Sequence, residues 1–170
     1  MARVRIFKHT AGACDAARRA LRKRREPLLA VFDVDSTLLG AGRRRIAAVC
    51  DLLRWIVGAG GAVHVVTARP EDSRQDTAAE LDAVGVGRHI EGLHMPPARL
   101  GSTAAISHWK AAARRGIAAR AGRQLSISVG DNLHDLAHVP FRDTGHAALL
   151  GGRHTQLGLL VKDGSRDRRR

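Results

Sequence analysis

Three short segments of the chain place acidic or hydroxyl side chains directly after a mainly apolar run. These segments are residues 33–38 after the run 28–32, Thr67 after the run 62–66, and residues 130–135 after the run 124–129. An apolar run of this length indicates a strand buried on both faces of a parallel sheet. Because ligands of open α/β sheets bind beyond the carboxyl ends of the strands, we expect the three segments to meet in one site.

The remaining pattern alternates helices with strands. Apolar residues at helical spacing predict helices over 46–57, 73–84 and 103–115, and strands are expected at 89–95, 147–150 and 157–161, the last two as short edge strands. Ser73, with Asp76 three positions later, has the pattern of a capping box. This alternation predicts an α/β fold, namely a Rossmann-like three-layer αβα sandwich with a mainly parallel sheet.

A chain of 170 residues suggests one domain with a substantial core. We divide it into a basic, helical N-terminal segment at 1–26, an α/β domain at 27–162 and a basic C-terminal tail at 163–170. Pro27 marks the first boundary because proline interrupts a helix. No internal repeat and no second domain is expected.

The composition is strongly basic. The formal net charge is +13, and 25 of the 29 basic residues are Arg, with clusters at 22–25 and 166–170. Such a surface attracts polyanions, so nucleic acid is one candidate partner. An excess of Arg and Ala is also what a GC-rich coding sequence produces, and both interpretations stay open at the level of sequence.

Cysteine usage and hydropathy indicate the compartment. Cys14 and Cys50 are too few for a disulfide framework, which favours a reduced environment. Residues 1–25 lack the continuous apolar stretch of an ordinary signal peptide, and no segment approaches the roughly 18 apolar residues of a membrane span. We therefore expect an intracellular protein without a membrane partner, and its oligomeric state cannot be predicted.

Asp33 and Asp35 are the first candidate catalytic residues. Their side chains project to the same side of an extended chain, because they are two positions apart. One carboxylate can then attack phosphorus to form an aspartyl-phosphate while the other transfers protons. Paired carboxylates also occur in turns and as calcium ligands, but their position directly after a buried strand favours catalysis.

Thr67, Arg69 and Lys110 are candidate phosphate-binding residues. Thr67 ends a predicted strand and can donate its hydroxyl, although a threonine at this position is also common as a turn or cap residue. Lys110 is one of only four lysines, and a compact ammonium suits phosphate, whereas the alternative is a solvated helix face. Arg69 can contact a phosphate or a ribose.

The segment 130–135 carries the candidate metal ligand. Asp131 can bind Mg²⁺, which prefers carboxylate and water oxygens, while the alternative is a helix N-cap. Asn132 and Asp135 are assigned supporting roles. His94, His108 and His134 lie near these segments, and a substrate contact is the less common role for such histidines. Trp55 and Trp109 are expected to be packing residues.

Taken together, these motifs resemble the haloacid dehalogenase superfamily of phosphohydrolases, and in particular its acid-phosphatase-like branch. The resemblance covers roughly residues 28–136 and rests on Asp33-Val34-Asp35-Ser36-Thr37, Thr67-Ala68-Arg69-Pro70-Glu71, Lys110 with Arg114, and Gly130-Asp131 with Asp135-Leu136. It implies the strand order 5-4-1-2-3 and dependence on Mg²⁺.

The resemblance also implies a role for each site residue. Asp33 would be nucleophile and metal ligand, and Asp35 the general acid and base, giving the metal only its backbone carbonyl. Thr67 and Lys110 would hold the phosphoryl group. Asp131 would bind Mg²⁺, and Asp135 would support a metal-bound water or orient Lys110.

The cap domains of the family are not expected here, because the segments between Asp35, Thr67 and Lys110 are short. An open site of this kind would serve nucleotide, nucleic-acid-end, phosphoprotein or metabolite substrates. The alternative is a catalytically degenerate nucleic-acid-binding protein on the same scaffold. That alternative explains the charge but not the intact set of carboxylates, Thr67 and Lys110.

Overall fold

The computed structural model describes residues 4–136, 146–151 and 156–162. The strands are β1 (Val4–Phe7), β2 (Leu29–Phe32), β3 (Ala62–Val66), β4 (Gly92–His94), β5 (Ile127–Gly130), β6 (Ala147–Leu150) and β7 (Leu157–Leu160). The α-helices are α1 (Thr10–Leu21), α2 (Ala47–Gly58), α3 (Arg74–Ala83) and α4 (Thr103–Ala121). Single 3-10 turns lie at η1 (Ala41–Arg43), η2 (Glu71–Ser73), η3 (Gly87–His89) and η4 (Leu133–Asp135).

The seven strands form one sheet in the order β1-β6-β7-β5-β2-β3-β4. The five strands from β7 to β4 are parallel, which confirms the predicted α/β fold and gives the expected order 5-4-1-2-3. Strands β6 and β1 extend the sheet in antiparallel pairs. The prediction that 147–150 and 157–161 are edge strands is wrong, because β6 and β7 lie between other strands and β1 and β4 form the edges.

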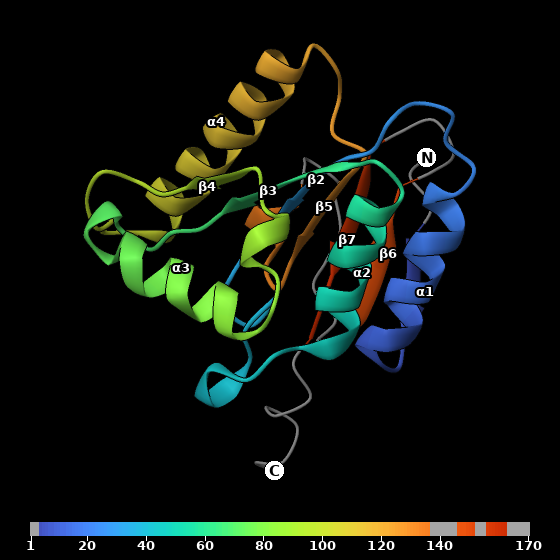
Figure 1. Cartoon of the computed structure of the whole chain (residues 1–170), viewed down its shortest axis with the longest axis horizontal. Helices are drawn as coiled ribbons and strands as arrows, with labels where there is room; N and C mark the ends of the chain where they lie inside the picture. Colours follow the sequence, from blue (N-terminus) through green and yellow to red (C-terminus); the bar gives the residue numbers. More distant parts are fainter. Residues whose placement is uncertain (1–3, 137–145, 152–155, 163–170) are drawn as a thin grey trace.

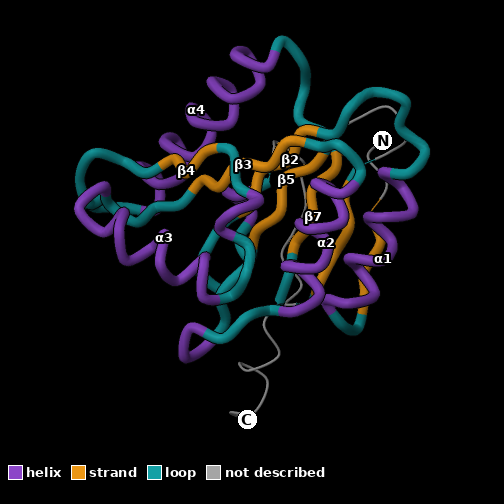
Figure 2. Tube along the Cα trace, in the orientation of Figure 1, coloured by secondary structure: helices purple, strands orange, loops and turns teal. Residues whose placement is uncertain are grey.

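Helices cover both faces of the sheet (Figures 1 and 2). Helices α1, α2 and α3 pack on one face, where residues such as Leu53 and Leu81 join the main hydrophobic core. Helix α4 packs on the other face, where Ile117 contacts Leu29 and Val31. The fold is therefore a three-layer αβα sandwich, the Rossmann-like architecture of haloacid dehalogenase proteins.

The N-terminal segment belongs to this sandwich. The sequence predicted a helix within 1–26; the structure has α1 there, and also a strand, β1, that pairs with β6. The small residues Ala13, Cys14, Ala16 and Ala17 of α1 are buried and join the main core. This packing holds the helix against the sheet; of its two basic residues, Arg19 is exposed and Arg18 is partly buried.

Two local expectations need correction. Ser73 does not form the predicted capping box, because its hydroxyl donates to the Pro70 carbonyl at 2.7 Å and α3 begins without a side-chain cap. Helix α4 extends past residue 115 to Ala121, where Gly122 ends it with a left-handed backbone conformation (φ 62°). The predicted tail at 163–170 lies outside the described residues.

Residues 33–110 are described throughout and contain no cap domain. Between β2 and β3 there is only a loop with η1 and the helix α2, and between β3 and α4 there are α3 and β4 with short turns. No described helix has the length and apolarity needed to cross a membrane.

Candidate active site

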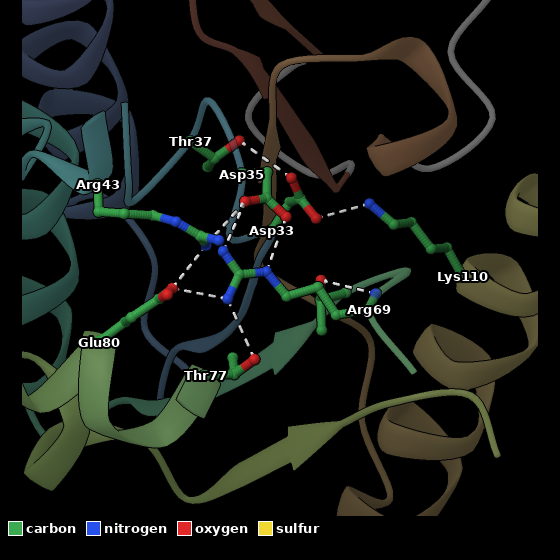
Figure 3. A network of polar contacts seen from close by, with 9 residues as sticks. Asp33, Asp35, Thr37, Arg43, Arg69, Thr77, Glu80 and Lys110 are labelled. Atoms are coloured by element: carbon green, nitrogen blue, oxygen red, sulfur yellow. Dashed lines mark hydrogen bonds and ion pairs between the residues drawn. The ribbon is translucent and has the colours of Figure 1, made fainter. Parts of the chain in front are cut away.

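Asp33 lies directly after the central strand β2 and is buried, with 6% of its surface exposed. Its backbone N–H donates to the Val129 carbonyl at 2.9 Å, which continues the pairing of β2 with β5 by one residue. The carboxylate accepts a hydrogen bond from Lys110 Nζ at 2.6 Å and one from Thr37 Oγ1 at 3.4 Å (Figure 3). The backbone pairing and these two side-chain hydrogen bonds together fix the position of the Asp33 carboxylate.

Lys110 reaches this point from α4, on the opposite side of the site. The Ser102 hydroxyl caps the start of α4 by accepting the Ala105 N–H at 3.1 Å. The buried Lys110 ammonium forms ion pairs with both Asp33 and Asp135. Burial opposes the charged form, but the charges of Asp33 and Asp135 outweigh it, so the pKa of Lys110 is raised and the ammonium is retained.

The third segment forms a tight turn after β5. The Asn132 backbone N–H donates to Asp135 Oδ2 at 3.1 Å, and the Asn132 side chain donates to Asp131 Oδ1 at 2.9 Å. The first of these bonds, with the Asp135 N–H donating to the Asn132 side chain, forms a capping box around η4. The sequence indicated a loop that enters a helix, whereas the structure has this single 3-10 turn, and residues 137–145 lie outside the described part.

Three carboxylates gather where the segments meet. Oxygens of Asp33, Asp131 and Asp135 lie within 4.8 Å of one another. Lys110 binds two of the three, and Lys162 Nζ donates to the Asp131 carbonyl at 3.1 Å, so the carboxylates still outnumber the ammonium groups. Burial, followed by the charge of Asp135, raises the pKa of Asp33 to about 7.

A divalent cation fits this donor set. Carboxylate oxygens are the ligands that Mg²⁺ prefers, and a cation would offset the repulsion that raises the Asp33 pKa. The cluster contains Asp33 and Asp131 as the sequence predicted, together with the Asp135 side chain. The Asp35 side chain is not in the cluster.

Asp35 lies at the mouth of the site, with 60% of its side chain exposed. Both of its oxygens accept hydrogen bonds from Arg69, from Nε at 2.9 Å and from Nη2 at 2.6 Å. Burial acts to raise the pKa of Asp35, but the hydrogen bonds and charge of Arg69 outweigh it and hold the pKa below its usual range. Asp35 is therefore an oriented carboxylate in this structure.

A network of polar contacts holds Arg69 in turn (Figure 3). Its Nη1 donates to Glu80 Oε2 at 2.7 Å and to Thr77 Oγ1 at 3.1 Å, and Arg43 donates to the same Glu80 oxygen at 2.8 Å. All three nitrogens of Arg69 thus have protein partners, and one N–H of Nη2 is left over by these bonds. Arg43 and Glu80 were not predicted as site residues, since nothing in their local sequence indicates that η1 and α3 meet here.

Thr67 ends β3 and has 1% of its surface exposed. Its N–H donates to the His94 carbonyl at 3.1 Å, and its carbonyl accepts the Trp109 Nε1–H at 3.1 Å. The hydroxyl oxygen accepts the Arg69 N–H at 3.3 Å, which leaves the hydroxyl hydrogen available to donate. Trp109, predicted to be a packing residue, thereby ties α4 to the end of β3.

The three histidines lie in different surroundings. His94 on β4 contacts His64 on β3, with 3.2 Å between Nε2 and Nδ1, and does not join the carboxylate cluster. His108 is exposed on α4. His134 lies 3.7 Å from Asp135, and burial lowers its pKa. Of the three, His134 is the one in contact with a residue of the cluster.

No family model matches this sequence, and no curated protein matches it. Among solved structures, the chain is similar to the class C acid phosphatase from Bacillus anthracis, with a TM-score of 0.56 and 17% sequence identity. The likeness covers 75% of this chain and 62% of that chain, so this chain spans less than two thirds of that phosphatase. At this identity the likeness establishes the haloacid dehalogenase-like fold.

Proposed function

We propose that the protein is a Mg²⁺-dependent phosphomonoesterase that acts through an aspartyl-phosphate on Asp33. The observation that carries this proposal is the buried Asp33 carboxylate, held by Lys110 at the end of the central strand within a cluster of three carboxylates. The likeness in fold to an acid phosphatase supports the same class of reaction.

Binding of the substrate is assigned to Lys110 and Thr67. The Lys110 ammonium is a compact point charge beside Asp33, and it would hold one phosphoryl oxygen. The Thr67 hydroxyl would donate to a second oxygen from the end of the neighbouring strand β3. Both groups are fixed by their elements, so little reorganisation is needed when the phosphoryl group arrives.

The metal ligands would be the side chains of Asp33 and Asp131 with the backbone carbonyl of Asp35. Mg²⁺, when bound, would keep Asp33 ionised and offset the charge of the phosphoryl group. Asp135 forms an ion pair with Lys110, so it would orient the ammonium and stay beside the metal ligands. Asn132 would hold the turn through its bonds to Asp131 and Asp135.

Transfer would take place in two displacements at phosphorus. In the first, an oxygen of Asp33 forms a bond to phosphorus, the ester P–O bond breaks, and Asp35 gives its proton to the leaving oxygen. In the second, Asp35 takes a proton from water, the water oxygen bonds to phosphorus, and the Asp33–phosphate bond breaks. The products are the alcohol, inorganic phosphate and free Asp33.

Asp35 must carry a proton for the first displacement, although Arg69 favours its carboxylate form. The negative charge of a bound phosphate ester would oppose Arg69 and favour protonated Asp35. Arg69 would position Asp35 through its two hydrogen bonds and would bind substrate phosphate through its remaining Nη2–H or by exchanging a partner. Arg69 would therefore be a residue that positions Asp35 and also lies close to the substrate.

The exposed position of Asp35 and the lack of a cap in residues 33–110 favour substrates that need an open site. Nucleotides, phosphorylated nucleic-acid ends and phosphoproteins all meet this condition. A degenerate nucleic-acid-binding role is less favoured, because Asp33, Lys110 and Asp135 keep the close pairing that a reaction requires and that nucleic-acid binding alone does not explain.

Turnover of an aryl phosphate tests the proposal. Purified protein should hydrolyse p-nitrophenyl phosphate with added Mg²⁺, lose this activity in excess EDTA and regain it when Mg²⁺ is restored. Asp33→Asn should lower kcat by more than about a thousandfold, the scale expected when a nucleophile is removed. Its fold should persist, since Lys110 keeps its ion pair with Asp135.

The control is Asp76→Asn, which removes an exposed carboxylate on α3 and should leave kcat and the melting temperature unchanged. Near-normal turnover by Asp33→Asn would exclude the proposed nucleophile. Full activity in excess EDTA would remove the metal from the mechanism, while leaving the assignment of Asp33 open to its own test.

A further inference from the structure

Arg114 is a buried guanidinium without a partner in the described part of the chain. It lies on α4, one turn after Lys110, and 7% of its surface is exposed. The described residues offer it neither a hydrogen bond nor an ion pair. Arginine stays charged in proteins, and a buried charge is costly unless something pairs with it.

The carboxylate whose charge acts on Arg114 forms no hydrogen bond or ion pair with it among the described residues. The charge of Asp135 acts on Arg114, but Asp135 Oδ1 binds Lys110 and Oδ2 accepts the Asn132 N–H at 3.1 Å. Burial accordingly lowers the pKa of Arg114, and Asp135 offsets this only in part. The guanidinium is left with donors that the protein does not use.

Arg114 lines a cavity of about 310 Å³ between α4 and the start of β5. The described part of the wall carries the donors of Arg115, Gln124 and Gln156 beside apolar residues, and this part includes no Asp or Glu. Gln156 is held in place by donating to Ser128 Oγ at 2.9 Å. A wall with cations and amides but no carboxylate favours an anion.

We propose that this cavity is a binding site for a small oxyanion, phosphate or carboxylate, which pairs with the Arg114 guanidinium. Its planar set of N–H donors matches two oxygens of either group, and Arg115 adds a second positive charge at the exposed rim. None of the three cluster carboxylates is among the described residues that line this cavity, so the proposal does not depend on the proposed phosphatase activity.

The side-chain Nε–Hε signal of Arg114 in an NMR titration of the full chain tests this site. Inorganic phosphate and acetate are the two probes, and at least one should shift the signal along a saturable curve. The probe that saturates at the lower concentration identifies which oxyanion the site prefers. If neither probe moves the signal at the highest concentration at which the protein stays folded, the proposal is wrong.

A charge-matched pair of variants separates the site from the general positive charge. Arg115→Glu reverses a charge at the rim and should raise the apparent Kd at Arg114 about fivefold, since an exposed charge contributes up to about 1 kcal/mol. Arg120→Glu makes the same change on an exposed residue of α4 that does not line the cavity, and it should leave that Kd unchanged. Equal effects of the two variants would contradict a defined site.

Discussion

Gly130 and Asp135 approach each other so closely that the site depends on the absence of a side chain at residue 130. A Cβ added at Gly130 would overlap the Asp135 side chain. Asp135 in turn binds Lys110, which binds Asp33. A single glycine therefore sets the distance between the turn after β5 and the residues that hold the phosphoryl group in the proposed reaction.

Gly130→Ala should consequently damage both stability and metal use. Overpacking of this kind costs about 1–3 kcal/mol in the free energy of unfolding, and displacement of Asp135 should raise the Mg²⁺ concentration needed for half-maximal turnover. Denaturant unfolding and a Mg²⁺ titration measure the two effects. Gly101→Ala is the control, because a Cβ there meets nothing within 4 Å. Equal behaviour of both variants would refute the steric argument.

At the scale of residues, the sequence was most informative about candidate site residues that lie at the ends of strands. Asp33, Thr67 and Asp131 could be located because each follows a buried run, and Lys110 because lysine is rare in this chain. The partners of Arg69 could not be located. Glu80 and Arg43 come from elements distant in sequence, and their contact depends on how α3 and η1 fold over the site.

At the scale of elements, β3 and β4 are joined through two histidines as well as through their backbone. His64 Nδ1 and His94 Nε2 lie 3.2 Å apart, so at least one ring must be neutral for the hydrogen bond to form. Burial, together with the charges of His64, Arg120 and Arg74, lowers the pKa of His94 to about 4. In the unfolded chain the pKa returns to about 6.5.

Stability should therefore depend on pH in this window. Between about pH 6.5 and about pH 4 the unfolded chain binds more protons at His94 than the folded protein, so the free energy of unfolding falls as the pH falls. Urea unfolding at several pH values measures this slope. His94→Gln should make the slope shallower, and the exposed control His108→Gln should not. An unchanged slope in His94→Gln would remove the histidine pair as its cause.

The sheet also shows where element-level prediction succeeds and fails. The order of the five parallel strands was predicted from the family resemblance and is confirmed. The assignment of β6 and β7 to an edge was wrong, and their continuous apolar character was the signal against it. An edge strand leaves one row of backbone N–H and C=O groups unpaired, and it is usually protected by charged residues or proline. Strand β1 was missed because its short, partly basic segment looks like the start of the helix that follows.

At the scale of the whole molecule, positive charge gathers at the end of the sheet opposite the candidate site. Lys23, Arg24, Arg25 and Arg123 line a cleft of about 970 Å³. The cleft lies before β2 and β5, whereas Asp33 and Asp131 follow these two parallel strands. The sequence could indicate the basic cluster at 22–25, but it could not indicate that Arg123, at the end of α4, lines the same cleft.

If the basic surface binds nucleic acid, this cleft should carry the interaction. The logarithm of the binding constant for a single-stranded oligonucleotide should fall linearly with the logarithm of the salt concentration. Each phosphate contact should contribute about 0.7 to the slope. Arg25→Glu with Arg123→Glu should reduce affinity and slope while leaving aryl phosphate turnover unchanged. The control Arg88→Glu with Arg99→Glu changes two exposed arginines elsewhere. Equal losses in both pairs would indicate general charge and not a defined surface.

The measurement that most directly tests the account is detection of a phosphoryl group on Asp33 itself. In Asp35→Asn the second displacement lacks its base, so an activated aryl phosphate should leave phosphorylated protein that accumulates within one turnover. Rapid acid quench followed by peptide mass spectrometry should place the phosphoryl group on Asp33, and the double variant with Asp33→Asn should carry none. Release of one equivalent of aryl alcohol without phosphorylated Asp33 would contradict the proposed mechanism.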